Sequence, residues 1–240
     1  YKRLQEIDKA KDDFISIASH ELRTPITAMR NYFSMLLEGS FGKISKETRD
    51  SVDMMMGNAD RLSNLVEDLL NVSRLQQGRI KVEPKNIDII PIIKDVVKSL
   101  DATAHEKKLE LLFDNEKDQV MAIADPERIR QVIINIIGNA LKYTEKGSVT
   151  VSLNEDPKQV DIKVKDTGIG ISAEAKERLF EKFYRVINEK TQKITGTGLG
   201  LWLTREILEL MDGKIYVDSI ENVGTQVTVT IPSGKKGMEN

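Results

Sequence analysis

Apolar side chains recur every seven residues in two blocks near the start of the chain, separated by a glycine-containing segment at 39–45. The heptad positions hold Ile15, Leu22, Met29 and Leu36 with Ala18, Pro25 and Tyr32 in the first block, and Val52, Ala59 and Val66 with Met55, Leu62 and Leu69 in the second. This period predicts two long helices that pair along a narrow seam. Ser45 is a suitable N-cap for the second helix. We therefore expect a helical hairpin over residues 14–80, and because two helices bury little apolar surface, dimerisation into a four-helix bundle.

The pattern changes after a linker predicted at residues 81–86, which contains Pro84. Apolar spacing favours one helix over Ile89–Lys107 and another opened by Asp125 and Pro126, an N-cap followed by a proline suited to the first helical position. The strand candidates are Leu109–Phe113, Val120–Ala124, Val149–Leu153, Val160–Val164, Ile215–Val217 and Gln226–Ile231. We expect an α/β two-layer sandwich over residues 87–233, with a helix layer on a sheet, and a frayed tail at 234–240.

Composition excludes several classes of protein. The chain has 240 residues and a net charge of -2, with basic residues spread along it, so nothing indicates an electrostatic nucleic-acid binder. It contains no cysteine, which excludes disulfides, thiolate metal sites and a cysteine nucleophile and favours a reducing compartment. No apolar run approaches the roughly 20 residues that span a bilayer. Because the chain begins at Tyr1, we expect a fragment whose upstream part has been removed.

His20 lies at the heptad position farthest from the predicted seam, so we expect it to face solvent. Thr24 follows one turn later on the same face. Pro25 should bend the helix and leave the carbonyl of Glu21 without its usual donor. An isolated exposed histidine is usually a solvated surface residue, and the run from Ser19 to Pro25 makes that interpretation less favourable here.

The helix opened by Asp125 carries Asn135, Asn139 and Lys142 at positions i, i+4 and i+7, which form one polar stripe. Asparagine is a poor helix former, so two of them among isoleucines require an explanation. A carboxamide oxygen suits Mg²⁺, and the lysine suits a phosphate. The alternative is a solvated helix face.

Two glycine clusters follow. Asp166–Gly170 (DTGIG) comes after a predicted strand, and its carboxylate could accept a hydrogen bond from an exocyclic amine such as that of adenine; alone, it could equally be a turn. Gly196–Leu201 (GTGLGL) leads into a helix predicted from about Leu199 to Met211, whose N-terminus suits phosphate. The spacing does not match a Rossmann fingerprint, and the chain contains no P-loop. Between the clusters, Phe180–Arg185 and about ten polar residues indicate a mobile lid, or a surface loop anchored by two core phenylalanines.

Together and in this order, these segments resemble the conserved boxes of bacterial sensor histidine kinases over nearly the whole chain. Ser19–Pro25 resembles the phosphoacceptor box, and Asn135–Tyr143 the asparagine box. Asp166–Gly170 and Gly196–Leu201 resemble the two glycine boxes, with Phe180–Arg185 as the phenylalanine box. The resemblance implies a dimerisation and histidine-phosphotransfer hairpin followed by an ATP-binding domain of the gyrase, histidine-kinase and MutL superfamily, with residues 1–13 as the end of a signalling helix.

The resemblance also implies roles for single residues. His20 is the expected phosphoacceptor, Glu21 the general base, and Thr24 the residue that orients a water for dephosphorylation of the partner. Mg²⁺ is expected at Asn139 with help from Asn135. ATP contacts are expected at Lys142, Tyr143, Asp166, Gly168, Gly170, Tyr184, Arg185, Gly196, Thr197, Gly198, Leu199, Gly200 and Thr225, with Asp166 at the adenine amine.

The expected activity is phosphorylation of His20 by ATP-Mg²⁺, transfer to an aspartate on the receiver domain of a response regulator, and dephosphorylation of that regulator. We expect a cytoplasmic homodimer that is not itself membrane-inserted, with a regulatory hinge at Leu75–Pro84. Asp212-Gly213 and Val227 depart from the family pattern at packing positions, and His105 is interpreted as a surface residue. The alternatives are an ATP-driven clamp like gyrase or the mismatch-repair ATPases, which lack the helical hairpin, and a dimeric scaffold with a vestigial ATP site.

Overall fold

The computed structural model describes residues 2–186, 188, 190–192, 194 and 196–234; within these, the side chains of 2–16 and of 20 are not described. The chain divides into two compact units, Tyr1–Lys81 and Val82–Asn240. Each unit has its own buried residues. No helix among the described residues is both long enough and apolar enough to cross a membrane.

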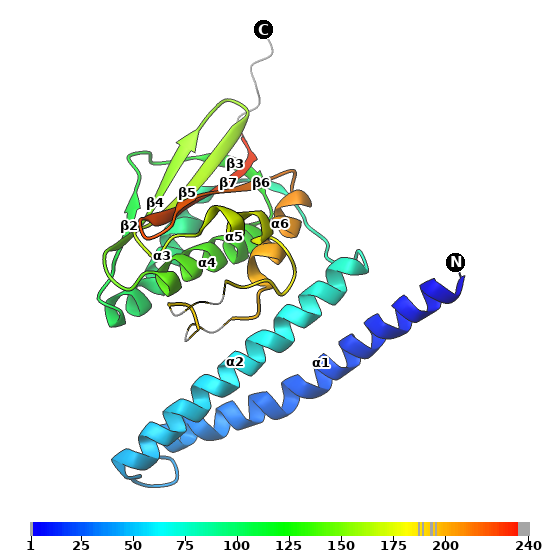
Figure 1. Ribbon diagram of the computed structural model, residues 1–240, viewed down its shortest axis with the longest axis vertical. Coiled ribbons are helices and arrows are strands. Elements are labelled where there is room, and N and C mark those ends of the chain that lie inside the picture. The colour runs from blue at the N-terminus through cyan, green and yellow to red at the C-terminus, as the bar shows by residue number, and fades with distance from the viewer. Residues whose placement is uncertain (1, 187, 189, 193, 195, 235–240) are drawn as a thin grey trace. The chain divides into compact units, whose positions relative to one another are not determined.

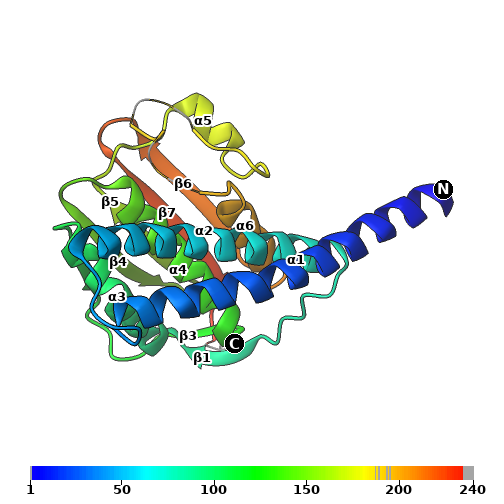
Figure 2. The same cartoon turned by 90° about the horizontal axis from the view of Figure 1, so that it is seen from below.

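The first unit is a hairpin of two helices, α1 (Lys2–Leu37) and α2 (Lys46–Gln76), as predicted (Figure 1). Ser45 caps α2, since its Oγ accepts a hydrogen bond from the backbone N–H of Thr48 at 3.2 Å. Salt bridges cross the hairpin at Arg23–Glu67 and Arg30–Asp60. The first turns of α1 extend beyond the end of α2 (Figure 2). The helix also continues through Pro25 without ending there.

The face of α1 that packs on α2 differs from the predicted seam. Ile26 is only 1% exposed and Ser19 is also buried, whereas Leu22 and Met29 are 48% and 41% exposed. The buried residues Ser19 and Ile26 each follow a residue of the predicted line through Ala18 and Pro25. The face that packs is therefore rotated by about 100° around the helix from that line. On α2, the predicted line through Val52, Ala59 and Val66 is buried, but Met55 and Leu62 are exposed. A single neighbouring helix covers only part of each apolar stripe, so the hairpin leaves apolar side chains uncovered.

The second unit is a five-stranded sheet covered on one face by helices, which confirms the predicted two-layer sandwich (Figure 1). Its elements are β1 (Lys85–Asp88), α3 (Ile89–Glu106), β2 (Glu110–Asp114), β3 (Met121–Ala124), α4 (Pro126–Tyr143), β4 (Ser148–Glu155), β5 (Gln159–Asp166), α5 (Ala173–Arg178), α6 (Gly200–Glu209), β6 (Lys214–Ile220) and β7 (Gly224–Pro232). The strand order is β2-β4-β5-β7-β6, with β2 parallel to β4 and the other pairs antiparallel. The strands β1 and β3 form a separate antiparallel pair.

The core of the second unit lies between the sheet and α3, α4 and α6. Alternate residues of β4 and β5 point into it, among them Val149, Val151 and Ile162. Along α4 the buried residues are Ile129, Val132, Ile133, Ile136, Ile137, Ala140 and Leu141. This apolar face anchors α4 to the sheet and determines which way its polar stripe points.

Two predictions for this unit are wrong in detail, and one of its helices was not predicted. The predicted linker is shorter, because Lys85 and Asn86 pair with Ala124 and Ile123 as the start of β1. Gly234 is not frayed, since its backbone N–H donates to the carbonyl of Met121 at 2.9 Å; residues 235–240 lie outside the described residues. The short helix α5, capped by Ser172, was not predicted.

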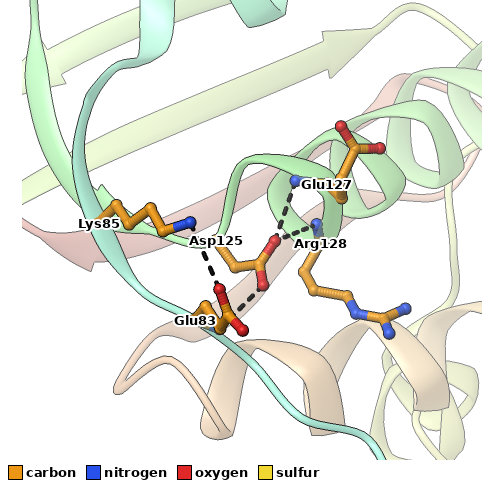
Figure 3. A network of polar contacts seen from close by, with 5 residues as sticks. All are labelled: Glu83, Lys85, Asp125, Glu127 and Arg128. Carbon is orange, nitrogen blue, oxygen red and sulfur yellow. Dashed lines mark hydrogen bonds and ion pairs between the residues drawn. The ribbon is translucent and has the colours of Figure 1, made fainter.

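Asp125 joins the start of α4 to the segment before β1 (Figure 3). Its Oδ1 accepts hydrogen bonds from the backbone N–H groups of Glu127 at 3.0 Å and Arg128 at 3.2 Å, which caps the helix. Its Oδ2 accepts from the backbone N–H of Glu83 at 2.9 Å. Burial acts to raise the pKa of Asp125, but these three donors and the positive charge of Arg128 outweigh it and hold the pKa below its usual value. One carboxylate therefore links α4 to the segment that leads in from the first unit.

Candidate functional site

The three residues predicted to act at the phosphoacceptor lie on α1 in the first unit. Glu21 and Thr24 have exposed side chains. The side chain of His20 lies outside those described, so its predicted exposure to solvent stays a prediction.

The polar stripe of α4 is not a solvated face, because Asn135, Asn139 and Lys142 are all partly buried. Asn135 donates a hydrogen bond from Nδ2 to Oγ1 of Thr204 on α6 at 2.8 Å. At the C-terminus of α4, Lys107 Nζ donates to the carbonyl of Leu141 at 2.8 Å. A positive charge is favourable at this end of a helix.

Lys142 and Arg185 form a partly buried pair of positive charges. Burial lowers the pKa of Lys142, and the positive charges of Arg185 and Lys107 lower it further. The guanidinium of Arg185 donates to the carbonyl of Ile194, and no salt bridge joins Lys142 or Arg185 to an acidic residue within the described part of the chain. Like charges placed together at a partly buried position favour a bound anion.

Asp166, at the end of β5, is buried, with 7% of its surface exposed. Burial raises the pKa of its carboxyl group, while hydrogen bonds from the backbone N–H groups of Gly168, at 2.8 Å, and Thr225, at 3.2 Å, act to lower it. Both donors reach Oδ1. The next residues are tied to α4, since Ile169 N–H donates to the carbonyl of Tyr143 at 3.2 Å.

Ser219 on β6 supports the same loop. Its Oγ accepts from the backbone N–H of Ile171 at 2.8 Å and lies 2.9 Å from Oγ1 of Thr225. The hydroxyl therefore joins the first glycine cluster to the start of β7.

The second glycine cluster packs against two other parts of the site. Gly198 has a φ of 75°, and its carbonyl accepts a hydrogen bond from Phe183 N–H at 3.0 Å. A Cβ at Gly198 would lie 2.6 Å from the carbonyl carbon of Phe183, and one at Gly200 would lie 2.7 Å from Oδ1 of Asn135. Thr197 Oγ1 accepts from the N–H of Leu199 at 3.1 Å. Only glycine allows these close approaches.

The segment Phe180–Arg185 is held by cation–π contacts. The guanidinium of Arg205 lies 5.6 Å from the ring centre of Phe180, and that of Arg178 lies 4.4 Å from the ring of Tyr184. Phe183 is 64% exposed and has a φ of 64°, so the alternative of two core phenylalanines is wrong for this residue. The predicted lid continues through residues 187, 189, 193 and 195, which lie outside the described residues.

The structure brings most of the predicted nucleotide-site residues of the second unit into one connected group. Asn135 meets Gly200, Lys142 lies beside Gly196, and Asp166 contacts Gly168 and Thr225. The carbonyl of Tyr143 joins the end of α4 to the Asp166 loop. Asn139 lies on α4 between Asn135 and Lys142, and Gly170 packs on the carbonyl of Ile220. Tyr184 instead contacts Arg178.

Sequence reasoning missed Lys107, Thr204 and Ser219. Thr204 carried a signal, because it is a polar residue that follows Trp202 and Leu203 and precedes Ile207 on an otherwise apolar face of α6. Lys107 and Ser219 had none, since a lysine after a helix and a serine in an edge strand are ordinary surface residues.

A metal ion bound in this group of residues would have few protein ligands. Among the described residues, no group of three or more His, Cys, Asp or Glu could hold a metal ion. The candidate donors are the carboxamide oxygens of Asn139 and Asn135. This set fits Mg²⁺, which usually keeps several waters and binds substrate phosphates together with one or two protein oxygens.

Two family models match the chain. The His Kinase A phospho-acceptor domain matches residues 10–78, in the first unit. The histidine kinase-, DNA gyrase B- and HSP90-like ATPase matches residues 124–235, in the second unit.

Known proteins resemble the chain over nearly its whole length. It is 36% identical over 232 residues to the sensor histidine kinase WalK of Bacillus subtilis, covering 95% of this chain but only 38% of that protein. The full-length ShkA structure in complex with AMPPNP has a TM-score of 0.73 at 28% identity, over 92% of this chain and 46% of that one. The Acinetobacter baumannii histidine kinase AdeS has a TM-score of 0.63 at 27% identity, over 89% of this chain and 98% of that one. The chain belongs to the histidine kinases, with a phosphoacceptor domain followed by an ATPase domain.

Proposed function

We propose that this chain is the kinase core of a sensor histidine kinase, which binds ATP in the second unit and phosphorylates His20 of the first. One observation supports the ATP site most directly. The buried carboxylate of Asp166 lies at one end of the connected group of residues, and the partly buried cations Lys142 and Arg185 lie at the other. Asp166 would accept a hydrogen bond from the adenine amine, while Lys142 and Arg185 would meet the phosphates. Tyr143 follows Lys142 in the chain, and its carbonyl accepts a hydrogen bond from the N–H of Ile169 in the loop after Asp166. It therefore connects the cation end of the group to the carboxylate end.

Asn139, with help from Asn135, would hold Mg²⁺, which supplies neutralisation of the phosphate charge when bound. Gly196, Thr197, Gly198 and Leu199 would bind the phosphates with the first turn of α6. Gly168, Gly170 and Thr225 would shape the adenine end, and Tyr184 would act with the lid. These residues orient the nucleotide and exclude water, which is most of what phosphoryl transfer requires.

His20 would supply the nucleophile. A neutral imidazole is already nucleophilic near pH 7, so Glu21 needs only to orient it and accept its other ring proton. Thr24 would orient the water that dephosphorylates the regulator. Because nucleophile and nucleotide site belong to different units, residues 75–84 would act as a hinge.

The proposed partners are a second copy of the chain and the receiver domain of a response regulator. The uncovered apolar residues Leu22, Met29, Met55 and Leu62 would pair with those of another hairpin to complete a four-helix bundle. The phosphoryl group would pass from the His20 nitrogen to a receiver aspartate.

The test is autophosphorylation with γ-labelled ATP and Mg²⁺. The chain has two histidines, which provides a matched control: His20→Gln should abolish labelling and His105→Gln should leave it unchanged. His105 is exposed and lies 3.5 Å from Asp101 on α3. The label should be labile in acid and stable in alkali, as expected of a phosphohistidine.

Other results would favour the alternatives. ATP hydrolysis without labelling would favour a clamp-like ATPase, and ATP binding without turnover a scaffold. Label that survives in His20→Gln would contradict the assigned acceptor. Phosphoryl transfer is tested by adding a response regulator to the labelled kinase and, in a separate reaction, a variant of that regulator with its receiver Asp changed to Asn. Only the unchanged regulator should remove label from the kinase.

A further inference from the structure

We propose that Thr204 is a positioning residue that sets which atom of the Asn135 carboxamide faces the phosphate end of the site. The inference rests on the proposed function, since it concerns how the chain would favour nucleotide with Mg²⁺. The hydrogen bond between Asn135 Nδ2 and Thr204 Oγ1 is 2.8 Å long and joins α4 to α6.

The carboxamide of Asn135 lies against one face of α6. Gly200 and Thr204 are four residues apart and therefore share that face, one turn from each other. A Cβ at Gly200 would lie 2.7 Å from Oδ1 of Asn135 and 3.2 Å from Nδ2. The carboxamide therefore packs on the bare backbone of Gly200 while its nitrogen donates to Thr204.

The hydroxyl is needed because apolar packing does not orient a carboxamide. Helices α4 and α6 pack together, and Thr204 is buried. Hydrophobic contact is not directional, and the oxygen and nitrogen of a carboxamide have nearly the same shape. A hydrogen bond is directional, and the Thr204 hydroxyl accepts from Nδ2 in this structure, which places the nitrogen on the Thr204 side and the oxygen against Gly200.

This orientation matters at the first turn of α6, where the second glycine cluster enters the helix. An oxygen placed there can ligate Mg²⁺ or accept a hydrogen bond from its waters, whereas an N–H group cannot. Loss of the Thr204 hydroxyl would allow the carboxamide to turn over. Loss of the hydroxyl should therefore weaken the binding of nucleotide together with Mg²⁺ and not the binding of nucleotide alone.

The test measures the dissociation constant of a fluorescent ATP analogue, once with Mg²⁺ and once with EDTA, for the chain and for two variants. Thr204→Val keeps the shape of the side chain and removes the hydroxyl, while Thr204→Ser keeps the hydroxyl. In Thr204→Val, the affinity with Mg²⁺ should fall about three- to tenfold, as for the loss of one buried hydrogen bond, and the affinity in EDTA should not change. Thr204→Ser should retain most of the Mg²⁺ effect.

A double variant gives an independent readout. In an Asn135→Ala background, Thr204→Val should have no further effect on the Mg²⁺-dependent affinity, since the two residues act through one bond. Equal losses with Mg²⁺ and with EDTA would overturn the inference and indicate a packing role. An unchanged Thr204→Val, or a Thr204→Ser variant as weak as Thr204→Val, would overturn it too.

Measurements on the wild-type chain distinguish failure of this inference about Thr204 from failure of the proposed function. If it binds no ATP analogue in either medium, the proposed function is wrong and the inference falls with it. If it binds equally well with and without Mg²⁺, ATP binding stands and only the inference is overturned.

Discussion

At the scale of single residues, Asp166 combines a buried position with a negative charge, and its two backbone hydrogen bonds both reach Oδ1. Asparagine in its place would keep that oxygen and replace Oδ2 with an amide nitrogen, which cannot accept a hydrogen bond from the adenine amine. We expect Asp166→Asn to weaken ATP binding about tenfold or more, as for the loss of a hydrogen bond to a charged group. Isothermal titration calorimetry of the variant with ATP measures the effect. An unchanged dissociation constant would remove Asp166 from the adenine site.

A second prediction for Asp166→Asn concerns the thermal stability of the folded protein. Because burial raises the folded-state pKa of Asp166 above its unfolded value, the folded protein holds the proton more tightly, and ionisation at neutral pH disfavours folding. That penalty is absent below the unfolded pKa of about 3.9 and is complete once the pH exceeds the folded pKa. Asp166→Asn should therefore raise the melting temperature at pH 7.5 and leave it unchanged near pH 3.5. A melting temperature that falls at pH 7.5 would indicate that the carboxylate stabilises the fold.

At the scale of elements, α4 depends on the carboxylate of Asp125 at its N-terminus. Asp125→Ala should lower the free energy of unfolding of the second unit by about 1–2 kcal/mol, the usual cost of losing an N-cap. Asp125→Ser is the matched control, because its hydroxyl can cap the helix but does not have a second oxygen for Glu83 N–H. Urea denaturation monitored by circular dichroism measures both variants.

The pH dependence of this effect has the opposite sign to that of Asp166. The folded-state pKa of Asp125 is lowered, so its stabilisation is present above the unfolded pKa of about 3.9 and is lost as the pH falls through the folded pKa. The difference between the chain and Asp125→Ala should shrink below pH 4. Equal stability of Asp125→Ser and the unchanged chain would show that the Glu83 contact contributes nothing.

The elements also show where sequence reasoning succeeds and fails. Helix α4 was predictable, because Asp125, Pro126 and the apolar spacing are local signals that agree. Strand β1 was not, since Lys85 and Asn86 carry no strand signal and are paired only by contact with β3, distant in the chain. The same contrast between local signals and distant contacts holds for the site. Its motifs were visible in the sequence, whereas the role of Thr204 depends on a contact with Asn135, 69 residues away.

At the scale of the whole molecule, the hairpin of the first unit has more apolar surface than it covers. Leu22 and Met29 on α1, and Met55 and Leu62 on α2, keep the heptad spacing of a seam but are exposed. Sequence could show that these residues have the spacing of a seam, but not which side of each helix packs inside the hairpin. On α2 one predicted line is buried and the other is exposed, whereas on α1 the buried residues Ser19 and Ile26 lie on neither predicted line.

Because these residues repeat every seven positions, the exposed line fits a second hairpin with the same repeat, which is the proposed homodimer. A charge placed in its middle should prevent association, since an unpaired buried charge costs several kcal/mol. We expect the unchanged chain to have the mass of two copies by light scattering, and Leu62→Arg to have the mass of one. Ile220→Arg is the matched control, because Ile220 is also an exposed apolar residue but lies on β6 of the second unit, so this variant should remain dimeric. A Leu62→Arg variant that stays dimeric would place the interface between copies elsewhere.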